Sequence, residues 1–321
     1  MSNGPDMRGL GMVVGAVLAV AWVAAAQDQP AAPSVAQLDH APATPQELAL
    51  PLVLWPETQT EPEPLAAWLL RVDLQCLGVE IVTMPAADPD GDGPAEAALT
   101  DPLELAHRYG ALAAVNANGF SGLPGPDGKA DSHWRVGLPV DMAGLVVSTG
   151  VVHSLPGAPH GGALAFWFDG AGDPHMGAFT GDVHRVREGC NAWWIDLVAE
   201  GRILPKPGGD RHPRTAIGLD ATGQWLLLVV VDGRQPRHSV GMTAQELAAL
   251  MAKHGCRRAI NLDGGGSTIL LASDSDGQLQ IINKPCDGKP RPLPMMLGVR
   301  RKAERSVRSI PGKGLVEPVG R

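Results

Sequence analysis

The run 261–267 carries the strongest chemical signal in the sequence. It reads Asn-Leu-Asp-Gly-Gly-Gly-Ser and lies between the apolar runs 259–260 and 268–271. Three consecutive glycines leave their N–H groups unshielded and can adopt positive φ angles, so the loop can form a nest of donors for an anion. Asp263 and Ser267 flank the glycines with a carboxylate and a hydroxyl. The run therefore indicates a catalytic or ligand-binding turn. The alternative is a tight strand–strand turn that only satisfies its own backbone.

Three other polar clusters stand at the ends of apolar, strand-like runs, where side chains can converge on one cleft. The first contains Asn116 and Asn118, which suit a turn as well as a ligand. The second contains Arg214 and Thr215. A guanidinium there can hold a phosphate through two hydrogen bonds, although a solvated surface arginine is the simpler interpretation. The third is 232–234, Asp-Gly-Arg, where a turn is expected in any case and the charges can form a local ion pair.

Taken together, these clusters resemble the phosphodiester glycosidase family. The resemblance rests on 214–218, 232–234, 241–247 and 261–267, and more weakly on 116–120. It implies an exported hydrolase that cleaves the glycosidic bond of a sugar-1-phosphodiester of the N-acetylglucosamine type, or of a related cell-envelope glycan. Because the phosphate is already a good leaving group, such an enzyme needs cations and N–H donors more than a strong general acid.

The resemblance also implies roles for individual residues. Arg214 and Arg234 are expected to hold the phosphate, together with the amides of the three glycines. Asp263 is expected to act as nucleophile or general base, with Asp232 as the competitor for that role. The expected substrate-binding residues are Asn116, Asn118, Thr215, Asn261, Gly264, Gly265, Gly266 and Ser267. Two alternatives stay open: a carbohydrate- or envelope-binding protein without catalysis on the same scaffold, and a different hydrolase such as an amidase or phosphodiesterase.

No cofactor is assured by the sequence. The acidic run 88–93 begins like an EF-hand calcium loop, but Leu99 occupies the twelfth position where glutamate is required, which favours a solvated turn. The ten histidines have no paired spacing typical of a zinc site, so no metal ligands are predicted. A divalent cation remains an open alternative.

Composition limits the class of protein and of partner. The chain has 321 residues, of which 44% are hydrophobic and 19% charged, with 40 Gly and 29 Pro, as in a loop-rich globular protein. A net charge of −8 provides no basic footprint, so nucleic acid is not an expected partner. The expected partner is a small-molecule or glycan substrate that carries a phosphodiester. The adjacent Trp193 and Trp194 could form a sugar platform, but core packing is their expected role.

The N-terminal segment predicts export. Arg8 precedes an uncharged apolar run, 9–26, that ends in three alanines, as in a secretory signal peptide. The mature protein is expected to be periplasmic or extracellular, with an uncleaved signal anchor as its only membrane contact. Because an exported chain permits disulfides, we expect at least one bridge, of undetermined pairing. Its four cysteines are Cys76, Cys190, Cys256 and Cys286.

The chain is predicted to contain one domain. A signal peptide over 1–26 and a Pro- and Ala-rich linker over 27–64 precede the domain at 65–302, and a basic disordered tail follows at 303–321. The expected fold is α+β, with a large, mainly antiparallel sheet and few helices. Asp101 predicts the start of a helix at 101–109, and a T-x-x-E capping box predicts a second helix at 243–254. The expected strands are 68–74, 79–82, 111–115, 145–148, 151–154, 214–220, 225–232, 258–262 and 296–299.

Overall fold

A computed structural model describes residues 46–48, 52–125, 127–157 and 162–302 of the chain. The predicted signal peptide, most of the predicted linker and the predicted basic tail lie outside these described residues. None of the described helices is long and apolar enough to cross a membrane.

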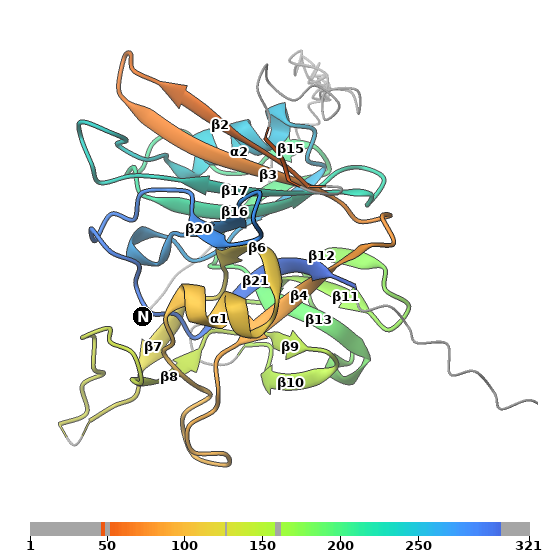
Figure 1. The fold of residues 1–321 in the computed structure, drawn as a ribbon, viewed down its shortest axis with the longest axis vertical. Coiled ribbons are helices and arrows are strands. Elements are labelled where there is room, and N and C mark those ends of the chain that lie inside the picture. Colours follow the sequence, from red (N-terminus) through yellow and green to blue (C-terminus); the bar gives the residue numbers. More distant parts are fainter. Residues whose placement is uncertain (1–45, 49–51, 126, 158–161, 303–321) are drawn as a thin grey trace, which may run out of the picture. The chain divides into compact units, whose positions relative to one another are not determined.

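The largest sheet has eight strands, and all of its strand pairs are antiparallel. Its strands in spatial order are β1 (Gln46–Leu48), β2 (Leu52–Gln59), β3 (Leu65–Asp73), β17 (Trp225–Val231), β16 (Arg214–Leu219), β18 (Arg258–Asn261), β14 (Asp196–Ala199) and β15 (Arg202–Ile203). The strands that carry the clusters singled out in the sequence, β16, β17 and β18, are neighbours in the interior of this sheet. Figure 1 shows β16 and β17 side by side.

Three smaller antiparallel sheets complete the described fold. One has the order β20 (Leu279–Ile281), β19 (Leu270–Ser273), β6 (Ala111–Asn116), β21 (Met295–Arg301) and β4 (Val79–Pro85). The second has the order β10 (Val151–Ser154), β9 (Val146–Ser148), β13 (Val186–Asn191), β11 (Leu164–Asp169) and β12 (Pro174–Ala178). The third has the order β5 (Ala97–Ala98), β8 (Pro139–Met142) and β7 (Phe120–Gly122).

The described residues contain two α-helices, and both begin at the predicted caps. In α1 (Pro102–Arg108), the Asp101 carboxylate accepts hydrogen bonds from the N–H groups of Leu103 and Glu104. In α2 (Ala244–Lys253), Thr243 and Glu246 form the reciprocal capping box. Short 3₁₀ turns occur at η2 (Val183–Arg185) and η3 (Gly265–Ser267). The fold is therefore mainly antiparallel β-sheet with two helices, which confirms the predicted class.

Both faces of the eight-stranded sheet are buried, which explains its continuous apolar strands. In β17, Leu226, Leu228 and Val230 join the main hydrophobic core that the sheet shares with β4, β6, β19 and β21. The alternate residues Leu227, Val229 and Val231 join a second core, which includes the apolar face of α2. A strand with period-two alternation would have exposed one of these faces.

Strand β2 lies inside the segment that was predicted to be a linker. Its residues pair with β3 from Leu52 to Gln59, and the side chains of Leu52, Leu54 and Trp55 are buried. Strand β1 pairs only with residues 52–54 of β2, so at Pro56 β2 is an edge strand among the described residues, where proline is tolerated. The ordered domain therefore starts before residue 65.

The expected disulfide is absent from the structure. All four cysteines, which lie within the described residues, are unpaired. Cys190 belongs to the main core and Cys256 to the core beneath α2, so the two buried thiols lie in different hydrophobic clusters. Burial raises the pKa of the Cys190 thiol to about 12, so it is held as a neutral apolar side chain.

Candidate active site

The triple-glycine loop connects the eight-stranded sheet to the five-stranded sheet that contains β19. It leaves the eight-stranded sheet at the end of β18 and enters the neighbouring sheet at β19. The Leu262 N–H bonds the Thr215 carbonyl on one side, and the Asp263 N–H bonds the Ala117 carbonyl on the other. The loop is thus fixed between β16 and the turn that follows β6.

Steric space explains why this loop contains glycines. A Cβ atom on Gly266 would lie 1.8 Å from Nη2 of Arg291, and one on Gly264 would lie 2.7 Å from the Pro213 carbonyl oxygen. Gly265 has a φ of +61°, which favours glycine, and the guanidinium of Arg234 packs against it. The glycines therefore let two guanidinium groups approach the backbone.

The predicted nest of N–H donors is only partly present. The Gly264 N–H donates to Oδ1 of Asp263 at 2.8 Å, and the Gly265 N–H donates to the Pro213 carbonyl at 3.0 Å. These two donors are used inside the protein, so they cannot clamp a phosphate without rearranging. The positive charge of the site comes mainly from side chains.

A cavity of about 240 Å³ lies over this loop. It brings together seven of the predicted site residues, from three separate segments of the chain: Arg214, Arg234, Asn261, Asp263, Gly264, Gly265 and Gly266. Four further residues complete its lining: Trp193, His212, Pro213 and Arg291. Asp263 is the one carboxylate of this lining, against three arginines.

The environment of Asp263 shifts its protonation. Burial raises the pKa of the Asp263 carboxyl to about 6, even though the Ser267 hydroxyl, the Gly264 N–H and the charge of Arg291 all act to lower it. The Ser267 oxygen is buried and makes no hydrogen bond of ordinary geometry within the described residues. The hydroxyl therefore lowers the pKa of the Asp263 carboxyl because it lies close to it. At neutral pH the group is an ionised base, yet it can hold a proton a little below neutrality.

Arg214 and Arg234 reach the cavity from different strands. Arg214 begins β16, and its Nε donates to the Met242 carbonyl at 3.1 Å. Arg234 follows β17 with a φ of +58°, a conformation that costs a non-glycine residue free energy and that often marks functional sites. Burial and the charge of Arg234 both lower the pKa of the Arg214 guanidinium, as expected for two cations without an anion between them.

Arg291 is the cation that sequence reasoning missed. Its Nη2 donates to Oδ2 of Asp287 at 2.9 Å, while its buried Nε has no hydrogen-bond partner among the described residues. It lies in a proline-flanked loop with no recognisable motif, so only the tertiary structure brings it to Gly266. His212 also lines the cavity; burial, then Arg214 and Arg234, lower its pKa, so it is a neutral ring at neutral pH.

The two tryptophans are not core residues, contrary to expectation. Their rings stack with centroids 4.3 Å apart and an angle of 24° between the ring planes. Trp193 lines the cavity and packs over Gly119, where a Cβ would lie 1.9 Å from the ring. Trp194 is 56% exposed and has a φ of +56°. The two residues lie between β13 and β14, and the positive φ at Trp194 accompanies this stacking of consecutive side chains.

Three predicted substrate-binding residues lie behind the cavity. Asn116 accepts hydrogen bonds from the Thr215 hydroxyl at 2.7 Å and the Ile269 N–H at 3.1 Å. Asn118 donates to the carbonyls of Ala143 and Leu145, and all three predicted residues are buried. Asn116, Asn118 and Thr215 therefore hold the loops that carry the site, and do not line it.

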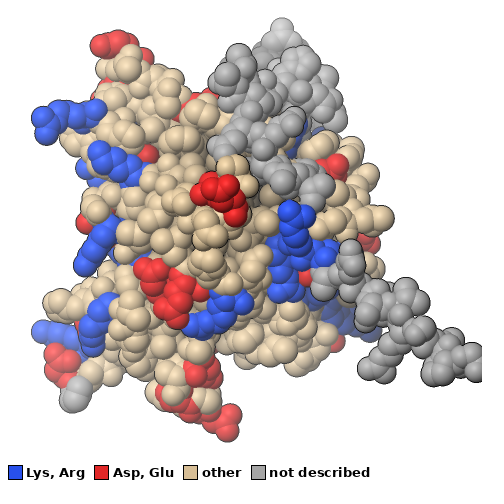
Figure 2. All heavy atoms as spheres, viewed as in Figure 1, with Lys and Arg blue, Asp and Glu red and all other residues tan. Residues whose placement is uncertain are grey.

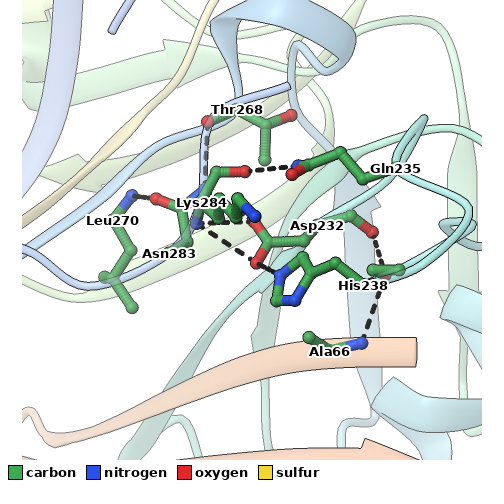
Figure 3. Close-up of polar contacts among 9 residues, drawn as sticks. Ala66, Asp232, Gln235, His238, Thr268, Leu270, Asn283 and Lys284 are labelled. Carbon is green, nitrogen blue, oxygen red and sulfur yellow. Dashed lines mark hydrogen bonds and ion pairs between the residues drawn. The ribbon is translucent and has the colours of Figure 1, made fainter. Parts of the chain in front are cut away.

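Asp232 is also placed behind the cavity. It is 2% exposed, and its carboxylate accepts hydrogen bonds from the Lys284 N–H, the Asn283 amide and the His238 ring, as Figure 3 shows. Its carboxylate oxygens are thus used to join β17 to the loop that contains Asn283. Asn261 differs from these residues, because its Oδ1 is buried without a hydrogen-bond partner in the described part of the chain and lies at the cavity.

The described residues contain no group of three His, Cys, Asp or Glu side chains arranged to hold a metal ion. In the run 88–93, Oδ1 of Asp88 accepts hydrogen bonds from the N–H groups of Asp90 and Gly91, so this run forms a local acidic turn.

The surface charges are mixed. On the face shown in Figure 2, Lys and Arg are interspersed with Asp and Glu.

Comparisons with solved structures agree with this fold. A structural match to the catalytic domain of zebrafish N-acetylglucosamine-1-phosphodiester alpha-N-acetylglucosaminidase, auto-inhibited by its pro-peptide, has a TM-score of 0.56 at 18% identity and covers 78% of this chain and 83% of that chain. A hypothetical protein from Synechocystis matches with a TM-score of 0.52 at 15% identity over 77% of this chain and 62% of that chain. A Burkholderia pseudomallei K96243 protein described as exported matches with a TM-score of 0.50 at 17% identity over 74% of each chain.

Sequence comparison identifies the family. A 58-residue stretch is 47% identical to the SPbeta prophage-derived uncharacterized protein YomE of Bacillus subtilis (strain 168), which covers 18% of this chain and 9% of that protein. The family profile named phosphodiester glycosidase matches residues 109–300, which include every residue of the cavity lining. The chain belongs to the phosphodiester glycosidase family.

Proposed function

We propose that the protein is an exported hydrolase that cleaves the glycosidic bond of a sugar-1-phosphodiester. The observation that carries this proposal is the composition of the cavity, in which a single carboxylate with a pKa of about 6 faces three guanidinium groups. Such a site suits an anionic leaving group beside a carbon that needs a nucleophile. Family membership and the activity named for the zebrafish protein support the same reaction.

The reaction breaks the bond between the anomeric carbon and the phosphate oxygen. In this proposal Arg214, Arg234 and Arg291 balance the charge that develops on the departing phosphomonoester. Asp263 in its carboxylate form either removes a proton from the attacking water or attacks the anomeric carbon itself, after which water releases the sugar. Since the leaving group is already a weak base, no second carboxylate is needed as a general acid.

Two side chains of the cavity lining suggest how the sugar is held. The unpartnered Oδ1 of Asn261 can accept a hydroxyl or N-acetyl N–H, and Trp193 offers an aromatic ring beside it. The N-acetylglucosamine type of sugar is therefore the substrate we propose to test first. The predicted signal peptide supports export, and N-terminal sequencing of the protein recovered outside the producing cell would test it.

The deciding experiment incubates the full chain with an α-N-acetylglucosaminyl methyl phosphodiester and measures free sugar. We expect release by the wild type, a loss of at least about a thousandfold for Asp263→Asn, and a loss of about 30- to 1,000-fold for Arg214→Gln. An arm with EDTA tests a divalent cation. Tight binding without release by the wild type would support the non-catalytic alternative. Release of N-acetylglucosamine 1-phosphate and methanol without free sugar would indicate a phosphodiesterase.

A further inference from the structure

Asp287 is a carboxylate that lies beside the cavity and that the proposed reaction does not use. Its Oδ2 accepts a hydrogen bond from Nη2 of Arg291 at 2.9 Å, and its Oδ1 accepts one from the thiol of Cys286 at 3.4 Å. Burial acts to raise the pKa of this carboxyl, but the hydrogen bonds from Arg291 and Cys286 and the charges of Arg291 and Arg234 lower it overall. Asp287 is therefore an ionised group with a partner on each of its two oxygens.

The triple-glycine loop provides the space for the ion pair between Asp287 and Arg291. A Cβ atom on Gly266 would overlap both Nη2 of Arg291 and Oδ2 of Asp287, so the two bonded atoms lie directly against the Gly266 backbone. Any side chain at this position would have to displace the pair. The pair therefore fixes the Arg291 guanidinium against the loop that bears the proposed catalytic carboxylate.

The loop that carries both members of the pair is anchored at its two ends. It runs from β20 to β21, and near its start the N–H of Lys284 donates to the buried Asp232 carboxylate at 3.0 Å (Figure 3). Near its end, the backbones of Leu293 and Thr100 exchange hydrogen bonds of 2.9 and 3.0 Å. The ion pair lies between these anchors and adds a contact with the triple-glycine loop in the middle of the segment.

Arg291 keeps one donor for a ligand. Its Nε is buried and has no hydrogen-bond partner among the described residues, and a buried donor of this kind costs free energy unless a ligand or solvent supplies an acceptor. The lining of the cavity includes Arg291 and does not include Asp287. The carboxylate therefore binds the guanidinium from outside the cavity and does not occupy the place of the phosphate.

We propose that Asp287 is a positioning residue for the phosphate of the substrate. It holds the Arg291 guanidinium against Gly266, and in this orientation Nε donates a charge-assisted hydrogen bond to a phosphate oxygen. This inference rests on the proposed function, because that function places the phosphate at Arg291. Charge alone predicts the opposite effect, since removal of a neighbouring carboxylate makes the cavity more positive and tightens the binding of any anion.

The test measures the binding of methyl phosphate, the leaving group of the methyl diester, to the full chain by calorimetric titration. We expect Asp287→Ala to weaken this binding by about tenfold. Asp287→Asn keeps an oxygen acceptor for Nη2 of Arg291, so its affinity should stay within about threefold of wild type. Glu104→Ala removes the carboxylate of an exposed pair with Arg108 at the same spacing in the chain, and this matched control should leave the affinity unchanged.

A second variant tests the donor itself. Arg291→Lys keeps the positive charge but lacks the Nε donor, so it should also weaken the binding of methyl phosphate by about tenfold. If Asp287 acts through Arg291, the addition of Asp287→Ala to Arg291→Lys should cause no further loss.

Failure of the inference and failure of the proposed function give different results. A folded Asp287→Ala protein that binds methyl phosphate as tightly as wild type, or more tightly, overturns the inference even if wild type cleaves the diester. An unchanged affinity in Arg291→Lys also overturns it, and this result does not depend on whether Asp287→Ala folds. A wild type that does not bind methyl phosphate at millimolar concentration overturns it as well. Binding that depends on Asp287, in a wild type that cleaves no diester, supports the inference and counts against the hydrolase.

Discussion

The side-chain amide of Asn116 donates a hydrogen bond to the backbone carbonyl of Asp263 at 2.6 Å, although 147 positions separate the two residues in the chain. Asn116 ends β6 in one sheet, and Asp263 follows β18 in another. The carbonyl oxygen of the same Asn116 side chain accepts the Thr215 hydroxyl and the Ile269 N–H. One buried amide therefore fixes the loop that bears the proposed catalytic carboxylate.

Replacing Asn116 with alanine should destabilise the protein and weaken catalysis. The substitution leaves a buried carbonyl, a hydroxyl and an N–H without their partner, so we expect the free energy of unfolding to fall by about 2–4 kcal/mol. Urea unfolding measures this change. Thr215→Val is the matched control, because it removes one of the three bonds and should cost only about 1 kcal/mol. Equal losses in the two variants would show that Asn116 does not fix this loop.

Replacing Asp263 with asparagine should stabilise the protein at high pH. The pKa of this carboxyl is raised from 3.8 to about 6 in the folded protein, so its contribution to stability is complete below pH 3.8 and is lost as pH rises through about 6. Asparagine avoids this loss, so the free energy of unfolding at pH 8 should rise by at most about 3 kcal/mol. Thermal unfolding of both proteins at pH 4 and pH 8 measures it. A constant difference in Tm would contradict the raised pKa.

The pH dependence of turnover should show the same titration. If the Asp263 carboxylate is the base or nucleophile, kcat/KM rises with pH and reaches a plateau above about 6. His212 lines the same cavity, and burial, then the charges of Arg214 and Arg234, lower its pKa. Rate profiles of His212→Gln separate the two groups. The rise of kcat/KM with pH should remain in this variant. If the rise disappears, it belongs to His212 and not to Asp263.

The fold was predictable from the sequence where local signals were strong. Both helices were marked by caps, and the hairpin at 148–151 by Thr149 and Gly150, which adopt positive φ angles of 50° and 81°. Strand β2 was not predicted, because Pro56 and the prolines around the strand resemble a linker, and because the burial of β2 depends on pairing with β3.

The candidate site was predictable only in part, for a similar reason. The motif glycines, Arg214, Arg234 and Asp263 belong to recognisable runs, and they line the cavity. Arg291 belongs to no such run, and its position depends on how a distant loop packs against Gly266. The stacking of Trp193 and Trp194 could not be inferred either, since it depends on one positive φ angle.

Glu57 should stabilise the added strand β2 through its contact with α2. Its carboxylate pairs with the ring of His254 and the amine of Lys253, at the end of that helix. The hydrogen bond with His254 is the main reason that the pKa of the Glu57 carboxyl falls to about 2. A lowered pKa contributes stability above pH 4.5, and this stability is lost as pH falls through about 2.

We therefore expect Glu57→Gln to lower the free energy of unfolding by about 1–2 kcal/mol at pH 7, because the pair is partly exposed to solvent. The difference from wild type should narrow as the pH falls from 5 to 3. Lys253→Ala removes the more exposed partner and should cost less than about 0.5 kcal/mol. A Glu57→Gln protein as stable as wild type at pH 7 would show that this contact contributes nothing to the strand.

The variants Asp232→Asn and Asp263→Asn should distinguish a structural carboxylate from the one that takes part in the reaction. The Asp232 oxygens accept the Lys284 N–H and the Asn283 amide, and an asparagine at this position would set one N–H donor against another. We expect Asp232→Asn to lose about 2–4 kcal/mol of stability in urea unfolding, but to keep kcat/KM within about tenfold when corrected for the folded fraction. Asp263→Asn should show the reverse pattern, with unchanged or higher stability and a loss of turnover. A well-folded Asp232→Asn protein without turnover would instead assign the role of nucleophile or general base to Asp232, the competitor that the sequence analysis named.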